Sequence, residues 1–327
     1  MSNKKIKIGV VGAGHLGRHH IKHLSRHSKV EFVGVFDSNK TVLNNICSEF
    51  SVKALESLDQ LISCCDAINI VTPTDTHFNI AKDFLNNKKD VLIEKPMTNT
   101  VEEAQELIDI AKKNNCIIQV GHIERFNPTI NKLNGFIKNP HYIEIERLAP
   151  FQSRGTEVPV ILDLMVHDID IVLGMVASPI ENIHASGAKM MSETIDLAHA
   201  HIKFKNGAVA NLKSSRIAQN YVRKIRTYQS NLYSVTDLMI PQIEIYSLEE
   251  SGIFSKNAIN KKVHTAAGEK ILRYEKFLPE KKDALLEEID DFINSIEKRI
   301  SPNVSGEDGK RALEIALEVE NKIFLNE

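Results

Sequence analysis

The turn from Gly12 to Gly17, GAGHLG, limits the possible folds of this chain more than any other part of its sequence. It follows the apolar run IKIGVV, which predicts a strand, and precedes a stretch with helical periodicity. In such a strand–turn–helix the first glycine permits the tight turn, the second admits a pyrophosphate, and the third lets the helix pack closely on the strand. The motif therefore predicts a dinucleotide-binding unit at the start of the chain.

Asp37 supports this prediction and suggests the cofactor. It stands at the end of the apolar run VEFVGVF, twenty residues after Gly17. An acid at this place accepts hydrogen bonds from the adenosine ribose and repels a 2′-phosphate, and no arginine follows immediately to hold that phosphate. We therefore expect NAD rather than NADP. The alternative, a glycine turn that binds no nucleotide, is disfavoured by the strand, the helix and the acid together.

The arrangement of the remaining apolar runs predicts an α/β fold with two domains. Up to about residue 120, short buried strands alternate with helical patterns, as in a doubly wound parallel sheet. Beyond about residue 140 the strands are longer and alternate apolar with polar residues, and two helices close the chain. Between two of these strands, Lys205-Asn206-Gly207 predicts a hairpin turn, since Asn-Gly tolerates positive φ angles. Since 327 residues are many for one core, we expect domains at 1–121 and 122–327, with the boundary near 121–128.

Composition excludes several classes of partner. The formal net charge of −2 offers no general attraction to nucleic acid or anionic membranes, and no apolar run reaches the roughly 20 residues that span a bilayer. The four cysteines, at 47, 64, 65 and 116, have no C-x-x-C spacing, which argues against a zinc site or a disulfide framework. We expect a cytoplasmic protein with reduced thiols and a small-molecule substrate.

The histidines after the glycine turn raise the possibility of a metal site. His19, His23 and His27 lie at i, i+4 and i+8, on one face of the expected helix. No acidic or cysteine ligand accompanies them in the sequence, so we predict no metal.

Two further motifs each follow an apolar strand, where open α/β sheets place their ligands. In VTPTDTH we expect Thr72, Thr74 and His77 near the cofactor. The competing interpretation makes His77 a helix-start residue that bonds to the backbone, with Asp75 or Thr76 as the N-cap.

The second of these motifs, IEKPMTN, contains Glu94, Lys95 and Pro96. Proline ends the strand and forces Lys95 into an extended conformation, so the ammonium group leaves the ligand edge of the sheet. A lysine there can bridge a substrate hydroxyl and the cofactor ribose. The alternative is a solvated surface lysine.

The segment LDLMVHDID, residues 162–170, places ionisable groups in an apolar run. It could be a metal site, an acid/base pair or an ordinary amphipathic helix. On a helix Asp163 and His167 are one turn apart, with Asp170 one step further along the same face. The spacing alone leaves the three possibilities open, and Asp168, which is off that face, is expected to be structural.

Taken in this order, GAGHLG, VTPTDTH, IEKPM and the D-x-x-x-H of Asp163 and His167 resemble the Gfo/Idh/MocA oxidoreductases. The resemblance implies a Rossmann domain ending near Gly121, then an α/β domain whose large, mostly antiparallel open sheet often makes oligomer contacts. It also implies that Lys95 and His167 flank the reacting carbon, with Asp163 as partner, and that the Lys-Pro bond is often cis. A homodimer or homotetramer is therefore expected.

Finer motifs are similar to the nucleotide-sugar branch of the family. GHIERFNP, FQSRGTEV and NGAVANLKSSR look most like bacterial UDP-N-acetylglucosamine 3-dehydrogenases, which oxidise the 3-hydroxyl of the sugar. Arg125, Asn127 and Arg154 are the expected substrate contacts, because arginine suits a diphosphate. Arg125 could equally form an ion pair at a domain interface.

The expected chemistry is hydride transfer from a secondary alcohol to NAD, with His167 as base and Lys95 lowering the pKa of the substrate hydroxyl. The alternatives are the same reaction on a free sugar, inositol or other polyol, and a regulator that binds the dinucleotide without catalysis. A zinc alcohol dehydrogenase is disfavoured by the cysteine spacing. The expected cofactor contacts are Gly12, Gly14, His15, Leu16, Gly17, Asp37, Thr72, Thr74, His77, Glu94 and Lys95.

Overall fold

The computed structural model of the protein describes residues 5–152, 155–250, 258–266 and 268–324. The chain forms two compact units, one of Met1–Phe126 with Asp283–Glu314 and one of Asn127–Lys282 with Ile315–Glu327. The first boundary falls inside the expected segment, but the expectation that 122–327 forms one domain differs from the structure. The reason is the helix at 284–298, whose residues Ile289, Phe292 and Ile293 are buried in the core of the first unit.

The sheet of the first unit has five parallel strands in the order β2-β1-β3-β4-β5. The strands are β1 (Ile6–Val11), β2 (Val30–Phe36), β3 (Ala67–Ile70), β4 (Asp90–Glu94) and β5 (Ile118–Gly121). β3 and β5 are buried throughout, which explains why their sequences are continuous apolar runs and do not alternate. The predicted doubly wound sheet is confirmed. Its order reverses between β1 and β3, and ligands bind beyond the carboxyl ends of the strands at such a point.

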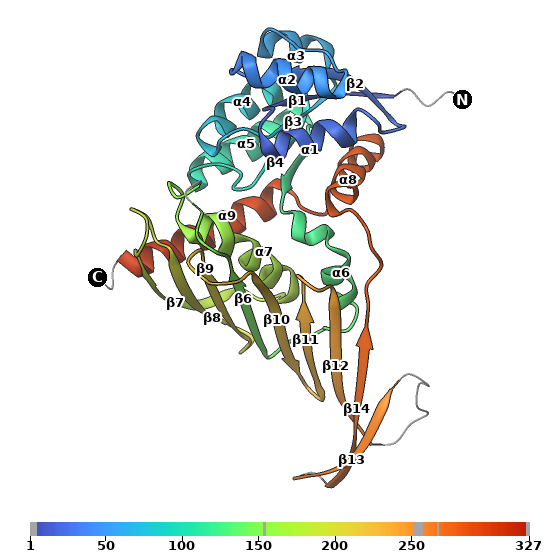
Figure 1. Ribbon diagram of the computed structural model, residues 1–327, viewed down its shortest axis with the longest axis vertical. Helices are drawn as coiled ribbons and strands as arrows, with labels where there is room; N and C mark the ends of the chain where they lie inside the picture. The colour runs from blue at the N-terminus through green and yellow to red at the C-terminus, as the bar shows by residue number, and fades with distance from the viewer. Residues whose placement is uncertain (1–4, 153–154, 251–257, 267, 325–327) are drawn as a thin grey trace. The chain divides into compact units, whose positions relative to one another are not determined.

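Helices cover the first sheet. They are α1 (His15–Leu24), α2 (Lys40–Phe50), α3 (Leu58–Cys64), α4 (Thr74–Asn86), α5 (Val101–Asn114), the 3-10 turn η1 (Ile123–Phe126), α8 (Ala284–Lys298) and the first part of α9 (Gly306–Phe324). α1, α2 and α8 share one apolar core with β1 and β2. α1 and α8 lie side by side although more than 250 residues separate them in the chain (Figure 1). α4 and α5 pack against each other.

The second unit contains a nine-stranded sheet in the order β13-β14-β12-β11-β10-β6-β9-β8-β7, with α6 (Pro128–Asn134) packed on β12 (Figure 1). Among the described strands of this second sheet, only β6 and β9 pair in parallel. The predicted large, mostly antiparallel sheet is therefore confirmed, as is the hairpin at Lys205–Gly207, where Gly207 has φ 86°. The strands are β6 (Tyr142–Leu148), β7 (Ile180–Ala188), β8 (Leu197–Phe204), β9 (Val209–Ser215), β10 (Val222–Gln229), β11 (Leu232–Asp237), β12 (Gln242–Glu249), β13 (Ile259–Thr265) and β14 (Gly268–Phe277).

The LDLMVHDID segment lies on this second sheet, and it is not one regular helix. Ile161–Met165 forms a π-helical turn, η2, and the α-helix α7 covers Val166–Met175. α7 packs on β6 and β9. A buried ion pair fastens it to β6, because Arg147 donates from Nε to Asp168 Oδ1 at 2.9 Å and Nη2 lies 2.8 Å from the same oxygen. Asp168 therefore has the structural role expected from the sequence, with Arg147 as its partner. Asp170, expected on the same helix face as Asp163 and His167, is buried.

Two further features concern the length of the helices and the state of the thiols. None of the helices in the described ranges is long and apolar enough to cross a membrane. All four cysteines carry free thiols. Burial raises the pKa of Cys65 to about 12 and that of Cys116 to about 11, so neither is a thiolate at neutral pH.

Breaking the Arg147–Asp168 pair should destabilise the second unit. Asp168→Asn removes the charge opposite a buried guanidinium, so we expect the free energy of unfolding to fall by about 3–5 kcal/mol in urea denaturation. Lys203→Ala is the matched control, because the Lys203–Glu181 pair is exposed and should contribute less than about 1 kcal/mol. Equal losses in the two variants would contradict the anchoring role of Asp168.

Candidate active site

The glycine turn has the geometry that its sequence predicts. Gly12 has φ 99°, and a Cβ there would lie 2.2 Å from the Val71 carbonyl oxygen. A Cβ on Gly17 would lie 2.0 Å from the carbonyl oxygen of Gly12. At Gly14, in contrast, no heavy atom of the described residues would lie within 4 Å of a Cβ. Two glycines are therefore required by close backbone contacts, and the third borders open space where a ligand can approach.

The amino end of α1 is suited to an anion. Gly14 is the N-cap and supplies no side-chain acceptor, and the first turn contains no acidic residue. The first backbone N–H groups of a helix have no partner inside the helix and carry a partial positive charge. The turn and the helix end therefore fit the pyrophosphate of NAD. His15 and Leu16, the first residues of α1, are both exposed beside this turn.

Asp37 connects the end of β2 to the glycine turn. Its Oδ2 accepts a hydrogen bond from the Ala13 amide at 2.7 Å, and its Oδ1 accepts one from the Asn39 amide at 2.7 Å. The carboxylate therefore lies at the ligand edge of the sheet, as the sequence predicts. Its contact with the ribose remains a prediction.

His77 joins the VTPTDTH and EKP loops. Its side chain is buried, with Nε2 2.8 Å from the Thr72 carbonyl oxygen and Nδ1 3.0 Å from the Pro96 carbonyl oxygen. Burial lowers the pKa of His77, although both carbonyl groups oppose this effect. The ring thus bonds to backbone, which was the competing interpretation. Its helix, α4, begins at Thr74 with Pro73 at the N-cap, so the expected caps Asp75 and Thr76 are wrong.

The EKP motif lies at the end of β4. Glu94 is the last residue of the strand, and the Lys95–Pro96 peptide is cis, as the family resemblance implied. Glu94 Oε2 accepts a hydrogen bond from the Lys95 backbone amide at 3.2 Å, and Oε1 lies 3.2 Å from His20 Nε2. Burial alone would raise the pKa of Glu94, but His20 and the Lys95 charge lower it below its ordinary value. Glu94 therefore directs its carboxylate toward His20 and the backbone.

The other predicted residues are distributed over both units. Asp163 in η2 and His167 in α7 are half-buried and belong to the second unit, whereas Lys95 belongs to the first. Because η2 is a π-helical turn, the regular i, i+4 spacing assumed for Asp163 and His167 does not hold. Arg125 is half-buried in η1, and Asn127 Oδ1 caps α6 by accepting from the Thr129 amide at 2.9 Å. Arg154 lies outside the described residues.

Two residues that the sequence analysis did not select join this site. His20 contacts Glu94, and Glu288 of α8 lies beside both. The sequence could have indicated Glu288, because this acid interrupts the apolar stripe of Leu285, Ile289, Phe292 and Ile296. For His20 the signal was hidden among neighbouring histidines. Of those, His23 pairs with Asp283 at 3.2 Å and His27 with Asp290 at 2.9 Å.

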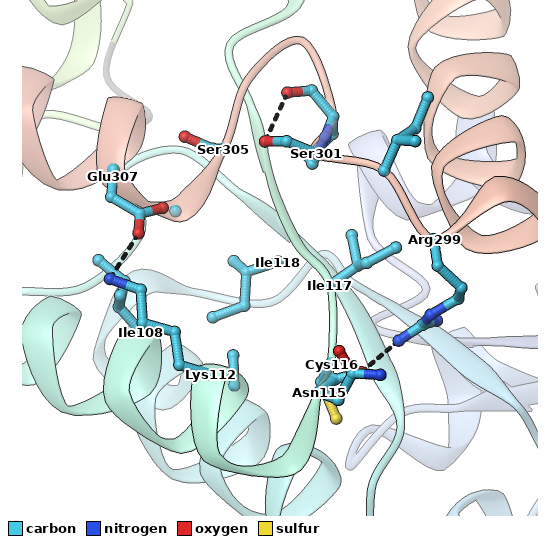
Figure 2. Close-up of a pocket in the computed structure, with 14 residues that line it drawn as sticks. Ile108, Lys112, Asn115, Cys116, Ile117, Ile118, Arg299, Ser301, Ser305 and Glu307 are labelled. Carbon is cyan, nitrogen blue, oxygen red and sulfur yellow. Dashed lines mark hydrogen bonds and ion pairs between the residues drawn. The ribbon is translucent and has the colours of Figure 1, made fainter.

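A separate pocket of about 200 Å³ lies at the other end of the first sheet (Figure 2). It is lined by residues that precede or begin β5, such as Asn115 and Ile118, and by the loop from Arg299 to Ser305. Arg299 donates to Asp90 Oδ2 at 2.7 Å and also to the Asn115 carbonyl. Since α/β sheets bind ligands at the carboxyl ends of their strands, this pocket is not the cofactor site.

Comparison with protein families gives two matches along the chain. An oxidoreductase family model with an NAD-binding Rossmann fold, GFO/IDH/MocA, matches residues 6–122. The GFO/IDH/MocA C-terminal domain matches residues 143–231.

Individual relatives match over almost the whole chain. A UDP-N-acetylglucosamine 3-dehydrogenase of Acidithiobacillus ferrooxidans is 35% identical over 96% of both chains. A solved structure of that enzyme has a TM-score of 0.88 at 34% identity and covers 98% of this chain and 97% of its own. A myo-inositol 2-dehydrogenase of Thermotoga maritima is 27% identical over 94% of this chain and 93% of its own. A Lactobacillus casei scyllo-inositol dehydrogenase solved with NAD(H) shares the fold at 20% identity, with a TM-score of 0.79 and coverage of 99% and 98%.

The glycine turn predicts different results for two alanine substitutions. Gly17→Ala places a methyl group against the Gly12 carbonyl, so we expect a lower melting temperature without cofactor and weaker NAD binding. Gly14→Ala meets no protein atom, so its melting temperature without cofactor should be unchanged while NAD binding weakens by about tenfold or more, a loss of about 1.4 kcal/mol. Calorimetric titration with NAD and thermal melts measure both quantities. Normal NAD affinity in Gly14→Ala would contradict the assigned cofactor position.

Proposed function

The chain belongs to the Gfo/Idh/MocA family of NAD-binding oxidoreductases, and from this premise we propose that it oxidises the 3-hydroxyl of a UDP-N-acetylglucosamine-type nucleotide sugar to the 3-keto sugar. The observation that carries the proposal is the 35% identity to a UDP-N-acetylglucosamine 3-dehydrogenase over 96% of both chains. Similarity of this extent includes the substrate-binding half of the chain as well as the Rossmann domain.

In the proposed reaction NAD, when bound, supplies the hydride acceptor. His167 takes the proton from the 3-hydroxyl as the C–H hydride leaves, and Asp163 orients its ring and stabilises the charged form. Lys95 places a positive charge beside the developing alkoxide. The approach of Lys95 to His167 is part of the proposal, because the two residues belong to different units.

Substrate binding is proposed for Arg125, Asn127 and Arg154. A guanidinium group matches the fork of phosphate oxygens in a diphosphate, and Arg125 is half-buried in η1, close in sequence to the unit boundary. In Asn127, the side-chain oxygen caps α6, so its amide N–H₂ is the group proposed to contact substrate.

A second candidate substrate is a free cyclitol or sugar. It is favoured by the 27% identity to a myo-inositol 2-dehydrogenase over 94% of this chain. A regulator that binds NAD without catalysis is the alternative of a different class, and it would have no chemical need for both Lys95 and His167.

The decisive assay incubates the protein with NAD and UDP-N-acetylglucosamine and follows NADH absorbance together with product mass. An α-ketoacid is included to recycle the cofactor if NADH stays bound. We expect a product two mass units below the substrate, since the oxidation removes two hydrogens. If only inositol or glucose is oxidised, the substrate is a free cyclitol or sugar, the second candidate, and not a nucleotide sugar.

Two substitutions test the proposed chemistry. Lys95→Ala and His167→Ala should each lower kcat by about 10²–10⁴-fold, the usual contribution of a positioned acid or base, with NAD affinity little changed in His167→Ala. Steady-state kinetics and NAD titration measure both effects. Full kcat in either variant would refute the mechanism.

We also propose that the chain forms a homodimer or homotetramer through one face of its nine-stranded sheet. Five tyrosines from adjacent strands cross this face in a row, with neighbouring ring centroids 4.7–5.6 Å apart. Rows of partly exposed aromatic rings are typical of protein interfaces. The five are Tyr142, Tyr228, Tyr233, Tyr246 and Tyr274.

Light scattering after size exclusion tests this proposal. The native protein should have a mass of two or four times 36.8 kDa, and Tyr233→Glu should lower it toward one chain. Leu278→Glu is the control, because Leu278 is 74% exposed and lies outside the tyrosine row. A monomeric native protein would exclude the proposed interface.

A further inference from the structure

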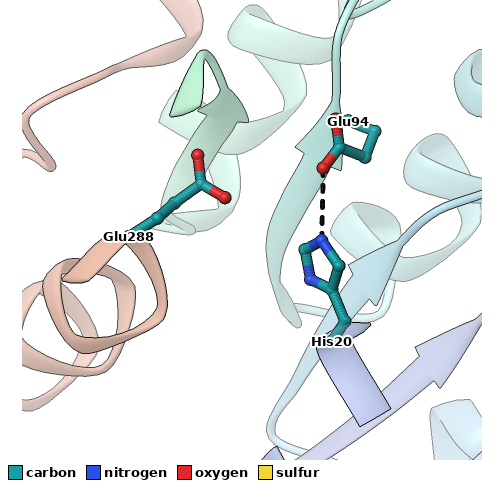
Figure 3. A group of neighbouring side chains, drawn as sticks. All are labelled: His20, Glu94 and Glu288. Carbon is teal, nitrogen blue, oxygen red and sulfur yellow. Dashed lines mark hydrogen bonds and ion pairs between the residues drawn. The ribbon is translucent and has the colours of Figure 1, made fainter. Parts of the chain in front are cut away.

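A buried cluster of three ionisable side chains lies under the ligand edge of the first sheet (Figure 3). It contains His20 of α1, Glu94 at the end of β4 and Glu288 of α8, and one nitrogen or oxygen atom of each lies within 4.8 Å of the others. His20 is 1% exposed and Glu288 is fully buried. The cluster therefore has almost no access to water that could solvate two acids.

The pleat of the sheet places Glu94 in this cluster. Leu92 pairs with Asn69 on one side and Gln119 on the other, so these three side chains share a face, and Glu94 follows on that face two residues later. Gly121 pairs with Glu94, and a Cβ on it would lie 2.9 Å from Glu94 Oε2. The Glu94 carboxylate thus occupies the space next to Gly121, where any larger residue would clash with it.

Hydrogen bonding accounts for His20 and Glu94. Asn69 Nδ2 lies 3.0 Å from His20 Nδ1 and can donate to it, which leaves the ring proton on Nε2 to be donated to Glu94 Oε1 at 3.2 Å. The other oxygen of Glu94 accepts from the backbone amide of Lys95. Both residues are therefore fixed, and Glu94 in turn fixes the peptide that carries Lys95.

Glu288 is the exception within this cluster. Neither carboxyl oxygen has a hydrogen-bond partner among the described residues, although Gln119 Nε2 holds the Glu288 backbone carbonyl at 2.9 Å. An ionised carboxylate in this position would be buried, unpaired and next to the Glu94 charge, which is strongly unfavourable. Burial first, and then the charges of Glu94 and Asp291, raise the pKa of Glu288 well above its ordinary value.

We propose that Glu288 serves as a carboxylic acid whose O–H is directed to the Glu94 carboxylate, and that His20, Glu94 and Glu288 together are positioning residues for Lys95. Glu94 then accepts hydrogen bonds from His20 of α1, from Glu288 of α8 and from the Lys95 backbone amide. These three donors fix the end of β4. This inference rests on the role proposed above for Lys95. The titratable groups that lie beside Glu288 or act on its charge are His20, Glu94 and Asp291. Lys95 follows Glu94 directly, and η1, which packs on α8, carries Glu124 and Arg125.

A metal ion is the competing occupant of the cluster. It would need the Nε2 lone pair of His20, but Nε2 faces Glu94 as a donor while Asn69 donates to Nδ1. The contacts therefore favour a shared proton over a cation, and metal content becomes an outcome of the test.

The protonation of Glu288 can be tested without a substrate. Because an acid with a raised pKa stabilises the folded state fully only below its ordinary pKa and loses this contribution as pH rises toward its folded pKa, Glu288→Gln should melt higher than the native protein at pH 8. The difference should shrink toward pH 5. Infrared spectra at pH 7 should also lose one protonated carboxyl band in Glu288→Gln.

Glu314→Gln on α9 of the same unit is the control, since Glu314 is exposed and the variant should keep the pH dependence and the band. A melting temperature at pH 8 that falls in Glu288→Gln, or an unchanged band, would overturn the proposal. So would one equivalent of metal in the native protein that is lost in Glu288→Gln, which would establish a metal centre instead.

The positioning role is tested by kinetics. Glu94→Gln and Glu288→Leu should lower kcat by about 10–100-fold with little change in the KM for sugar, because they misplace Lys95 without removing it. Glu288→Gln should recover most of the kcat that Glu288→Leu loses, since its amide N–H replaces the O–H donor. Equal kcat in the Leu and Gln variants would refute this role.

If no sugar is turned over, the proposed function fails, while the melting and infrared results still decide the state of Glu288.

Discussion

The close approach of Gly17 to the carbonyl of Gly12 determines where α1 begins, and much of the first unit depends on it. Once α1 is fixed, its histidines reach Glu94, Asp283 and Asp290. Two of these acids flank or belong to α8, which comes from the far end of the chain and completes the core on this face of the sheet. The glycine turn that fits the cofactor therefore also positions α1, and α1 in turn holds α8.

In the second unit, the short helix α7 is held on a mostly antiparallel sheet. Alternating residues of β6 achieve this: Ile143 and Ile145 are buried beneath the helix layer, and Arg147 bonds to Asp168. The π-helical turn before α7 then carries Asp163. Such turns often occur at functional sites, where they change the direction of a side chain relative to a regular helix.

The residues proposed for the chemistry lie within the two family matches, since Lys95 falls in residues 6–122 and Asp163 and His167 fall in residues 143–231. Glu94 illustrates how the parts interact. Its place in the EKP motif predicts a cofactor contact, but in the fold its oxygens bond to His20 and to the Lys95 backbone amide. The lysine of the EKP motif is therefore held by an acid whose own charge is stabilised by His20, 74 positions earlier in the chain.

The sequence by itself determined the order of strands and helices in the first unit, the glycine turn, the hairpin at Lys205–Gly207 and the family. These features depend on local periodicity, turn chemistry and short motifs, which neighbouring residues encode. Only the tertiary structure decided that α8 returns to the first sheet, that His77 bonds to backbone, that Asp170 is buried, and that His20, Glu94 and Glu288 meet. These contacts join residues separated by up to 268 positions, from His20 to Glu288, and no local pattern specifies which distant element covers a given face. Packing and the need to satisfy buried polar groups make that choice.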